Sequence, residues 1–125
     1  MSGRLALCAT LLALGAGCVA ERAYQGPERS AAELARIEGS PRINAGLPLA
    51  AVIRKIDDQV VGIGHARVLV LPGSHRLLID CVMAATRTTT RFELTVETYA
   101  GRRYVLVADS APGNLRCGSV RADER

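Results

Sequence analysis

Aromatic residues and long apolar segments are both scarce in this sequence. Its 125 residues include no tryptophan, one phenylalanine and three tyrosines, so a core must be built mainly from aliphatic side chains. A chain of this length forms one domain and not two. After the first twenty residues no apolar run approaches the roughly 18 residues of a membrane-spanning helix. We therefore expect no further membrane span.

A strong excess of positive charge is also missing. Lysine and arginine total 16 against 12 acidic residues, which gives a net charge of +4, and the basic residues are spread along the chain. Domains that bind nucleic acid usually concentrate their basic residues on one face or helix. The sequence therefore predicts no nucleic-acid partner.

The common catalytic signatures are absent as well. No C-x-x-C redox pair is present, and Ser74 and Ser110 lie in no nucleophile-elbow motif. Gly62 and Gly64 precede no helix signal, so they do not form a phosphate-binding loop. We expect no enzymatic activity, no catalytic residue, no cofactor and no bound metal.

Asp80 is the carboxylate that most resembles a catalytic group, because it lies between Ile79 and Cys81 in an apolar stretch. A carboxylate in such surroundings can have a raised pKa and act in catalysis. The favoured interpretation is an ion pair with Arg76 or with an arginine of the next strand.

Residues 1–17 have the features of a bacterial lipoprotein signal peptide. Arg4 gives a positive start, an apolar stretch runs from Leu5 to Leu14, and small residues lead to Cys18. This segment resembles a lipobox, in which the cysteine is acylated and becomes the new N-terminus. The resemblance implies lipidation of Cys18 and attachment to a membrane.

Two further points concern the processing site. The residue after the cysteine is Val19 and not aspartate, which by resemblance to bacterial sorting implies the outer membrane, with the domain facing the periplasm. The lipobox is imperfect, because the usual leucine three residues before the cysteine is replaced by Gly15. Cleavage after Ala20, giving a soluble periplasmic protein, is the alternative.

The remaining cysteines predict a disulfide. Cys8 lies in the apolar part of the leader and Cys18 is assigned to the lipid, which leaves Cys81 and Cys117. In an oxidising compartment two remaining thiols usually pair. We expect a structural disulfide between them, because zinc would need two further ligands.

The mature chain is predicted to be all-β, a small antiparallel β-sandwich of Ig-like style or a partly open barrel. Residues 18–33 are expected to form a lipid-anchored tether and residues 34–125 the sandwich; Ser30 and Glu33 have the spacing of a helix capping box. Turn residues separate five or six apolar or alternating runs, with Asp57-Asp58, Pro72-Gly73 and Gly101 among the turns. The expected strands lie within 49–57, 60–71, 75–85, 91–100, 102–109 and 115–122.

Several sequence blocks together resemble the short, uncharacterised lipoproteins of proteobacteria that have a PEGA-like β-sandwich. The blocks are Tyr24-Gln25-Gly26-Pro27, AELARIEG at 32–39, IRKIDD at 53–58, VLVLPGSHRLLIDC at 68–81 and AGRRYVLVAD at 100–109. The resemblance implies a sandwich fold in the cell envelope and no particular activity.

Two kinds of binding residue stand out. His75 follows the Pro72-Gly73 turn, and we expect its ring to hydrogen-bond a turn carbonyl and hold a hairpin.

The favoured function is a non-catalytic accessory module that contacts another envelope protein or peptidoglycan; the alternative is a periplasmic small-ligand or metal-binding domain using His65 and His75. Arginines in the stretch 86–91 and at 102–103 could hold carboxylates or lipid headgroups, or could simply lie on the solvated face of an edge strand.

Overall fold

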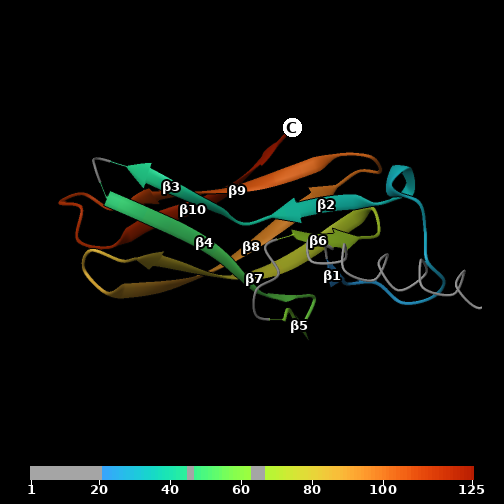
Figure 1. The fold of residues 1–125 in the computed structure, drawn as a ribbon, viewed down its shortest axis with the longest axis horizontal. Coiled ribbons are helices and arrows are strands. Elements are labelled where there is room, and N and C mark those ends of the chain that lie inside the picture. Colours follow the sequence, from blue (N-terminus) through green and yellow to red (C-terminus); the bar gives the residue numbers. More distant parts are fainter. Residues whose placement is uncertain (1–20, 45–46, 63–66) are drawn as a thin grey trace, which may run out of the picture.

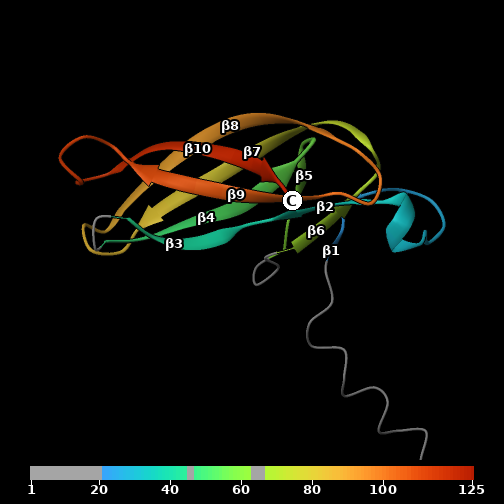
Figure 2. The same cartoon turned by 90° about the horizontal axis from the view of Figure 1, so that it is seen from above.

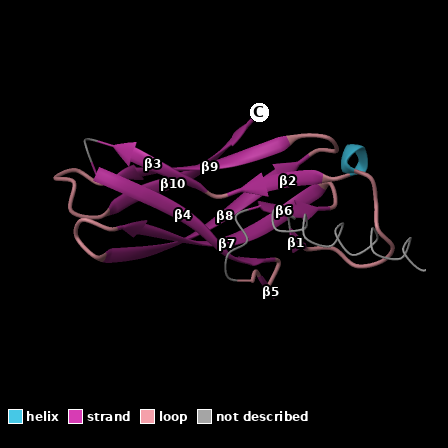
Figure 3. Ribbon diagram, in the orientation of Figure 1, coloured by secondary structure: helices cyan, strands magenta, loops and turns pink. Residues whose placement is uncertain are grey.

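A computed structural model describes residues 21–44, 47–62 and 67–125, without the side chains of residues 40–47. The leader, Cys18 and His65 lie outside the described residues. The described chain is almost entirely β-strand, with a single turn of 3-10 helix, η2 (Ala31–Glu33) (Figure 3). The strands are β1 (Glu21–Arg22), β2 (Ala35–Glu38), β3 (Ser40–Asn44), β4 (Leu47–Ile56), β5 (Gln59–Val60), β6 (Arg67–Val70), β7 (Gly73–Met83), β8 (Thr88–Thr98), β9 (Arg103–Ser110) and β10 (Cys117–Glu124).

The strands form two sheets that pack as a β-sandwich, which confirms the predicted fold class (Figures 1 and 2). The first sheet has the order β1-β6-β2-β9-β10, and the second has the order β3-β4-β7-β8, with β5 paired to β4. Most pairs are antiparallel, but β1 pairs with β6 and β2 pairs with β9 in parallel. The parallel β2–β9 pair joins segments that are far apart in the sequence.

The core lies between the sheets and is mainly aliphatic. Alternation along β7 places Leu77, Ile79, Cys81 and Met83 on the inner face, and all four are fully buried. Strands β6 and β9 contribute the facing layer. Its principal side chains are Val68, Val70, Tyr104, Leu106 and Ala108.

The disulfide between Cys81 and Cys117 is present and crosses this core. It joins β7 in the second sheet to β10 in the first, with the two Cα atoms 6.2 Å apart. Both cysteines are buried. The link therefore connects the two layers of the sandwich covalently, as the cysteine count predicts.

Asp57 and Asp58 form the expected turn after β4. Both have positive φ values, 49° and 68°, and the paired residues Ile56 and Gln59 flank them. Positive φ at both central positions is the geometry of a type I′ turn, whose twist suits a two-residue hairpin. This turn joins β4 to the short strand β5.

The prediction of a hairpin at Pro72-Gly73 is wrong. Strand β6 pairs with β1 and β2 in one sheet, whereas β7 pairs with β4 and β8 in the other. Gly73 has a φ of +136° at this point. The Pro-Gly pair therefore carries the chain from one sheet to the other. The sequence of a Pro-Gly turn does not distinguish a hairpin within one sheet from a crossing between two sheets.

Two further segments differ from expectation. Glu21 and Arg22, at the start of the expected tether, form β1, and the Glu21 carboxylate accepts a hydrogen bond from the Gly62 backbone N–H at 3.1 Å. Strand β3 was not predicted, because Pro41 and its polar neighbours give no strand pattern. Pro41 is acceptable there because β3 is the last strand of its sheet.

No helix in the described part of the chain is long and apolar enough to cross a membrane.

Candidate functional site

The outer face of the first sheet carries a cluster of arginines around one carboxylate. Alternation along β2 turns Ala35 and Ile37 into the core, where both are buried, and places Arg36 and Glu38 on the opposite face. The register of the neighbouring strands brings in two more residues: Arg103 lies opposite Arg36, and Arg67 lies opposite Glu38.

Three guanidinium groups converge on the Glu38 carboxylate through their Nε atoms. Arg103 Nε donates a hydrogen bond to Oε2 at 2.9 Å. Arg36 Nε lies 2.9 Å from Oε1, and Arg67 Nε lies 3.6 Å from the same oxygen. We call Arg36, Arg67, Arg103 and Glu38 the arginine cluster. Its three positive charges against one negative charge leave an excess of two.

One donor of this cluster lacks a partner. Arg36 Nε is buried, and although it is close to Glu38, its N–H has no acceptor in hydrogen-bonding geometry among the described residues. A buried donor without an acceptor is unfavourable unless something else satisfies it. The arginine cluster is thus not electrostatically or geometrically saturated by Glu38.

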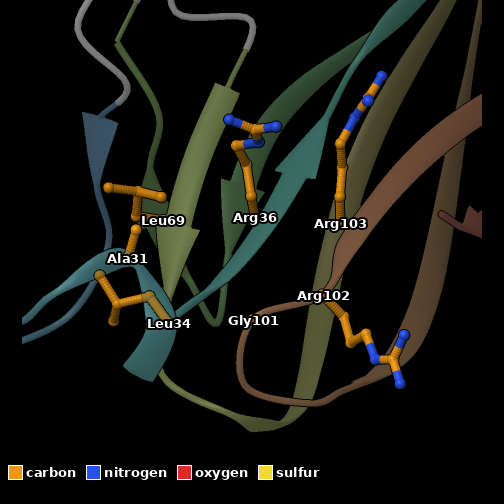
Figure 4. A pocket seen from close by; sticks show the side chains of 7 residues that line it. All are labelled: Ala31, Leu34, Arg36, Leu69, Gly101, Arg102 and Arg103. Atoms are coloured by element: carbon orange, nitrogen blue, oxygen red, sulfur yellow. The ribbon is translucent and has the colours of Figure 1, made fainter.

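A shallow pocket of about 200 Å³ lies beside the cluster (Figure 4). The side chains of Arg36 and Arg103 extend in the same direction from neighbouring strands, Leu34 and Leu69 form an apolar side, and Arg102 points away from the other two arginines. The pocket therefore combines guanidinium groups with an apolar wall.

The β8–β9 turn closes one side of this pocket. Gly101 has a φ of +76°, which favours glycine, and Arg102 N donates to Tyr99 O across the turn. Gly101 N donates to Leu34 O at 2.8 Å, and Arg36 N donates to Arg102 O at 3.0 Å. These bonds attach the predicted Gly101 turn to the start of β2.

His75 does bond a carbonyl, as predicted, but in a different setting. Its Nε2 lies 2.6 Å from Leu71 O, in the crossing between the sheets, and its Nδ1 lies 2.5 Å from Asp57 Oδ2, in the β4–β5 turn. Burial raises the pKa of Asp57, but the Arg76 backbone N–H and His75 outweigh this effect and hold the pKa below 3.8. His75 therefore connects the β4–β5 turn to the crossing between β6 and β7, and it does not hold a hairpin.

The metal-site alternative gains little from this geometry. Both ring nitrogens of His75 already face oxygen acceptors, and His65 lies outside the described residues. Within residues 21–44, 47–62 and 67–125, no group of three or more His, Cys, Asp or Glu side chains could hold a metal ion. A metal at His75 would have to displace Asp57 or Leu71.

Asp80 forms the expected ion pair with an arginine of the next strand. Arg91 on β8 donates to its carboxylate at 2.8 and 3.2 Å, and Arg54 on β4 donates at 2.9 Å. The hydrogen bonds from Arg91, followed by those from Arg54, lower the pKa of Asp80 below 3.8 despite its burial. Arg76 instead pairs with Asp58 at 3.0 Å. The pKa of Asp80 is therefore lowered, whereas the catalytic interpretation expected it to be raised.

The two arginine-containing stretches have different surroundings. Within the stretch 86–91, residues 88–91 belong to the edge strand β8 and Arg91 pairs with Asp80. Of the 102–103 pair, Arg102 lies 3.5 Å from Glu124, whereas Arg103 belongs to the arginine cluster. The sequence did not indicate Arg36, Glu38 or Arg67 as binding residues; the only available signal was the i, i+2 spacing of Arg36 and Glu38 in a short strand.

No family model matches the chain, and neither does any curated protein or solved structure.

Proposed function

We propose that the chain is a non-catalytic lipoprotein of the bacterial cell envelope. It is anchored in the outer membrane through acylated Cys18 and faces the periplasm, where its β-sandwich binds another envelope protein or the cell wall. The observation that carries this proposal is the Cys81–Cys117 disulfide in the core. Disulfides persist mainly in oxidising compartments, and a leader of the kind found in residues 1–17 directs chains to such a compartment.

The binding part of the proposal is supported by the outer face of the first sheet. Arg36, Arg67 and Arg103 are each about half exposed, and their charges are only partly balanced by Glu38. Guanidinium groups bind carboxylates and phosphates through paired hydrogen bonds. Anionic groups of an envelope protein or of peptidoglycan have the chemistry to dock there.

Fractionation of cells that produce the chain tests the anchor. Cys18→Ala removes the proposed lipid acceptor, and Cys8→Ala is the matched control, because it changes a cysteine of the same leader. We expect the wild type and the control in the outer-membrane fraction and Cys18→Ala as an unprocessed precursor. Normal maturation of Cys18→Ala to a soluble product would favour cleavage after Ala20.

The binding role needs a second measurement. Affinity capture from cross-linked envelopes, with the wild type and with Cys18→Ala, asks whether the same partner or sacculus fragments are retained. We expect capture that depends on the anchor, because anchoring concentrates the sandwich at the membrane surface. A chain that captures nothing from envelopes in either form would contradict the proposed binding role.

A further inference from the structure

We propose that the arginine cluster is a binding site for the phosphate group of an amphipathic molecule. This inference rests on the proposed binding role and names the ligand chemistry. Strand pairing brings Arg36, Arg67 and Arg103 together from β2, β6 and β9, although 67 positions separate Arg36 from Arg103 in the numbering. Strand pairing therefore sets the relative backbone positions of the three arginines.

The donor geometry leaves hydrogen bonds available for a ligand. In all three arginines Nε is the guanidinium nitrogen nearest to Glu38, and their terminal amino groups make no hydrogen bond to a carboxylate among the described residues. The terminal amino groups of a guanidinium form a planar fork that matches two oxygens of a phosphate.

Charge distinguishes this cluster from the other ion pairs of the described chain. Asp80 is shared by two arginines, which leaves an excess of one positive charge. At Glu38 an excess of two positive charges remains. A phosphate monoester carries about −1.5 to −2 at neutral pH, and so it neutralises this excess, whereas a carboxylate would leave half of it.

The adjoining pocket indicates what the phosphate is attached to. Leu34 and Leu69 form an apolar side next to Arg36 and Arg103, and the pocket of about 200 Å³ is open to solvent (Figure 4). An apolar portion of the ligand would cover these leucines while its phosphate meets the guanidinium groups. A lipid phosphate headgroup and a free phosphate monoester share this chemistry, and the experiment separates them.

Calorimetric titration of the full chain in zwitterionic detergent micelles tests the site. The probes are glycerol 3-phosphate, dihexanoyl phosphatidic acid and acetate. We expect both phosphates to bind and acetate to bind at least about tenfold more weakly, since fewer charge-assisted hydrogen bonds form. Tighter binding of the diacyl probe identifies a lipid phosphate; equal binding identifies a free phosphate monoester. Binding of neither phosphate, or equal binding of acetate, overturns the proposal.

Matched variants separate the site from general charge. Arg103→Gln should weaken glycerol 3-phosphate binding about tenfold or more. Arg67→Gln should weaken it less, because the Arg67 side chain is more exposed than that of Arg103 and its Nε lies farther from Glu38. Arg116→Gln makes the same charge change in the loop between β9 and β10, at the other end of the sandwich, and should change affinity less than twofold (Figure 1). Equal losses in Arg103→Gln and Arg116→Gln, or no loss in either, would refute a specific site.

Folding and localisation are checked independently. Arg103→Lys keeps the charge and removes the fork, so an affinity between those of the wild type and Arg103→Gln is expected even if the glutamine variant is destabilised; wild-type affinity would contradict bidentate binding. Failure of the Cys18 fractionation with intact phosphate binding would refute the lipoprotein anchor alone. Absent phosphate binding in a correctly anchored chain would refute the site alone.

Discussion

Cys81 and Cys117 join the two sheets through the middle of the core, with their Cα atoms 6.2 Å apart and both side chains buried. The link lies between β7, at the centre of its sheet, and β10, at the edge of the other. In a domain without tryptophan, whose fully buried side chains are mainly aliphatic, such a link supplies a large part of the stability. The same two residues are the strongest support for an oxidising compartment.

The disulfide should dominate the stability of the sandwich. Its two cysteines are separated by 36 residues, and chain-entropy arithmetic for such a loop gives on the order of 4 kcal/mol. We expect Cys81→Ala/Cys117→Ala to lower the free energy of unfolding by about that amount in urea denaturation, with Ser119→Ala, at an exposed position of β10, as the control that has little effect. Two alkylatable thiols at positions 81 and 117 in protein isolated from the periplasm would contradict the disulfide in the native protein.

His75 should act on stability and not on ligand binding. His75→Ala removes the contacts to Leu71 O and Asp57 Oδ2, so the free energy of unfolding should fall by about 1–3 kcal/mol, the range for a hydrogen bond to a charged group. Ser74→Ala, at an exposed neighbouring position of β7, is the control and should have little effect. A His75→Ala protein with an unchanged melting temperature that has lost binding of a metal ion would show instead that the residue is functional.

Asp80 should make stability fall in acid. Because Arg91 and Arg54 hold its folded pKa below the unfolded value near 3.8, its contribution is fully present above about pH 4 and is lost as the pH falls through the lowered pKa. Asp80→Asn should cost about 1–2 kcal/mol at pH 7, a figure reduced because both arginines are partly exposed.

Measuring the stability of the wild type and of Asp80→Asn over a range of pH separates the contribution of Asp80 from that of the other carboxylates. The stability difference between the wild type and Asp80→Asn should shrink in urea titrations between about pH 4 and pH 2. Asp58→Asn is the matched control, because it breaks an exposed ion pair with Arg76 and asparagine tolerates the positive φ of this turn. A constant difference across this range for Asp80→Asn would contradict the lowered pKa.

The sequence predicts local features of the fold well because they depend on neighbours in the chain. The alternation in β7 identifies Leu77, Ile79 and Met83 as core residues, and the cysteine count identifies the disulfide. The turn at Gly101 follows from a residue that accepts a positive φ. Each of these predictions needs only the alternation of apolar residues along a strand, the presence of a turn residue or the number of cysteines.

The arginine cluster could not be predicted in this way. Glu38 and Arg103 are 65 residues apart and meet only because β2 pairs in parallel with β9. Whether Pro72-Gly73 forms a hairpin or a crossing similarly depends on which sheet each flanking strand joins. The packing of the whole chain determines this. Sequence analysis identified Arg103 as a candidate binding residue, but its partners were set by this long-range topology.

Mass measurement of the mature N-terminus is the most direct test of the envelope-lipoprotein proposal. Protein extracted from membranes is digested, and its N-terminal peptide is identified by mass spectrometry. We predict a peptide that begins at Cys18 and carries the mass of acyl chains on that cysteine. An unmodified peptide that begins at Glu21, from protein recovered in the soluble periplasmic fraction, would contradict the proposal.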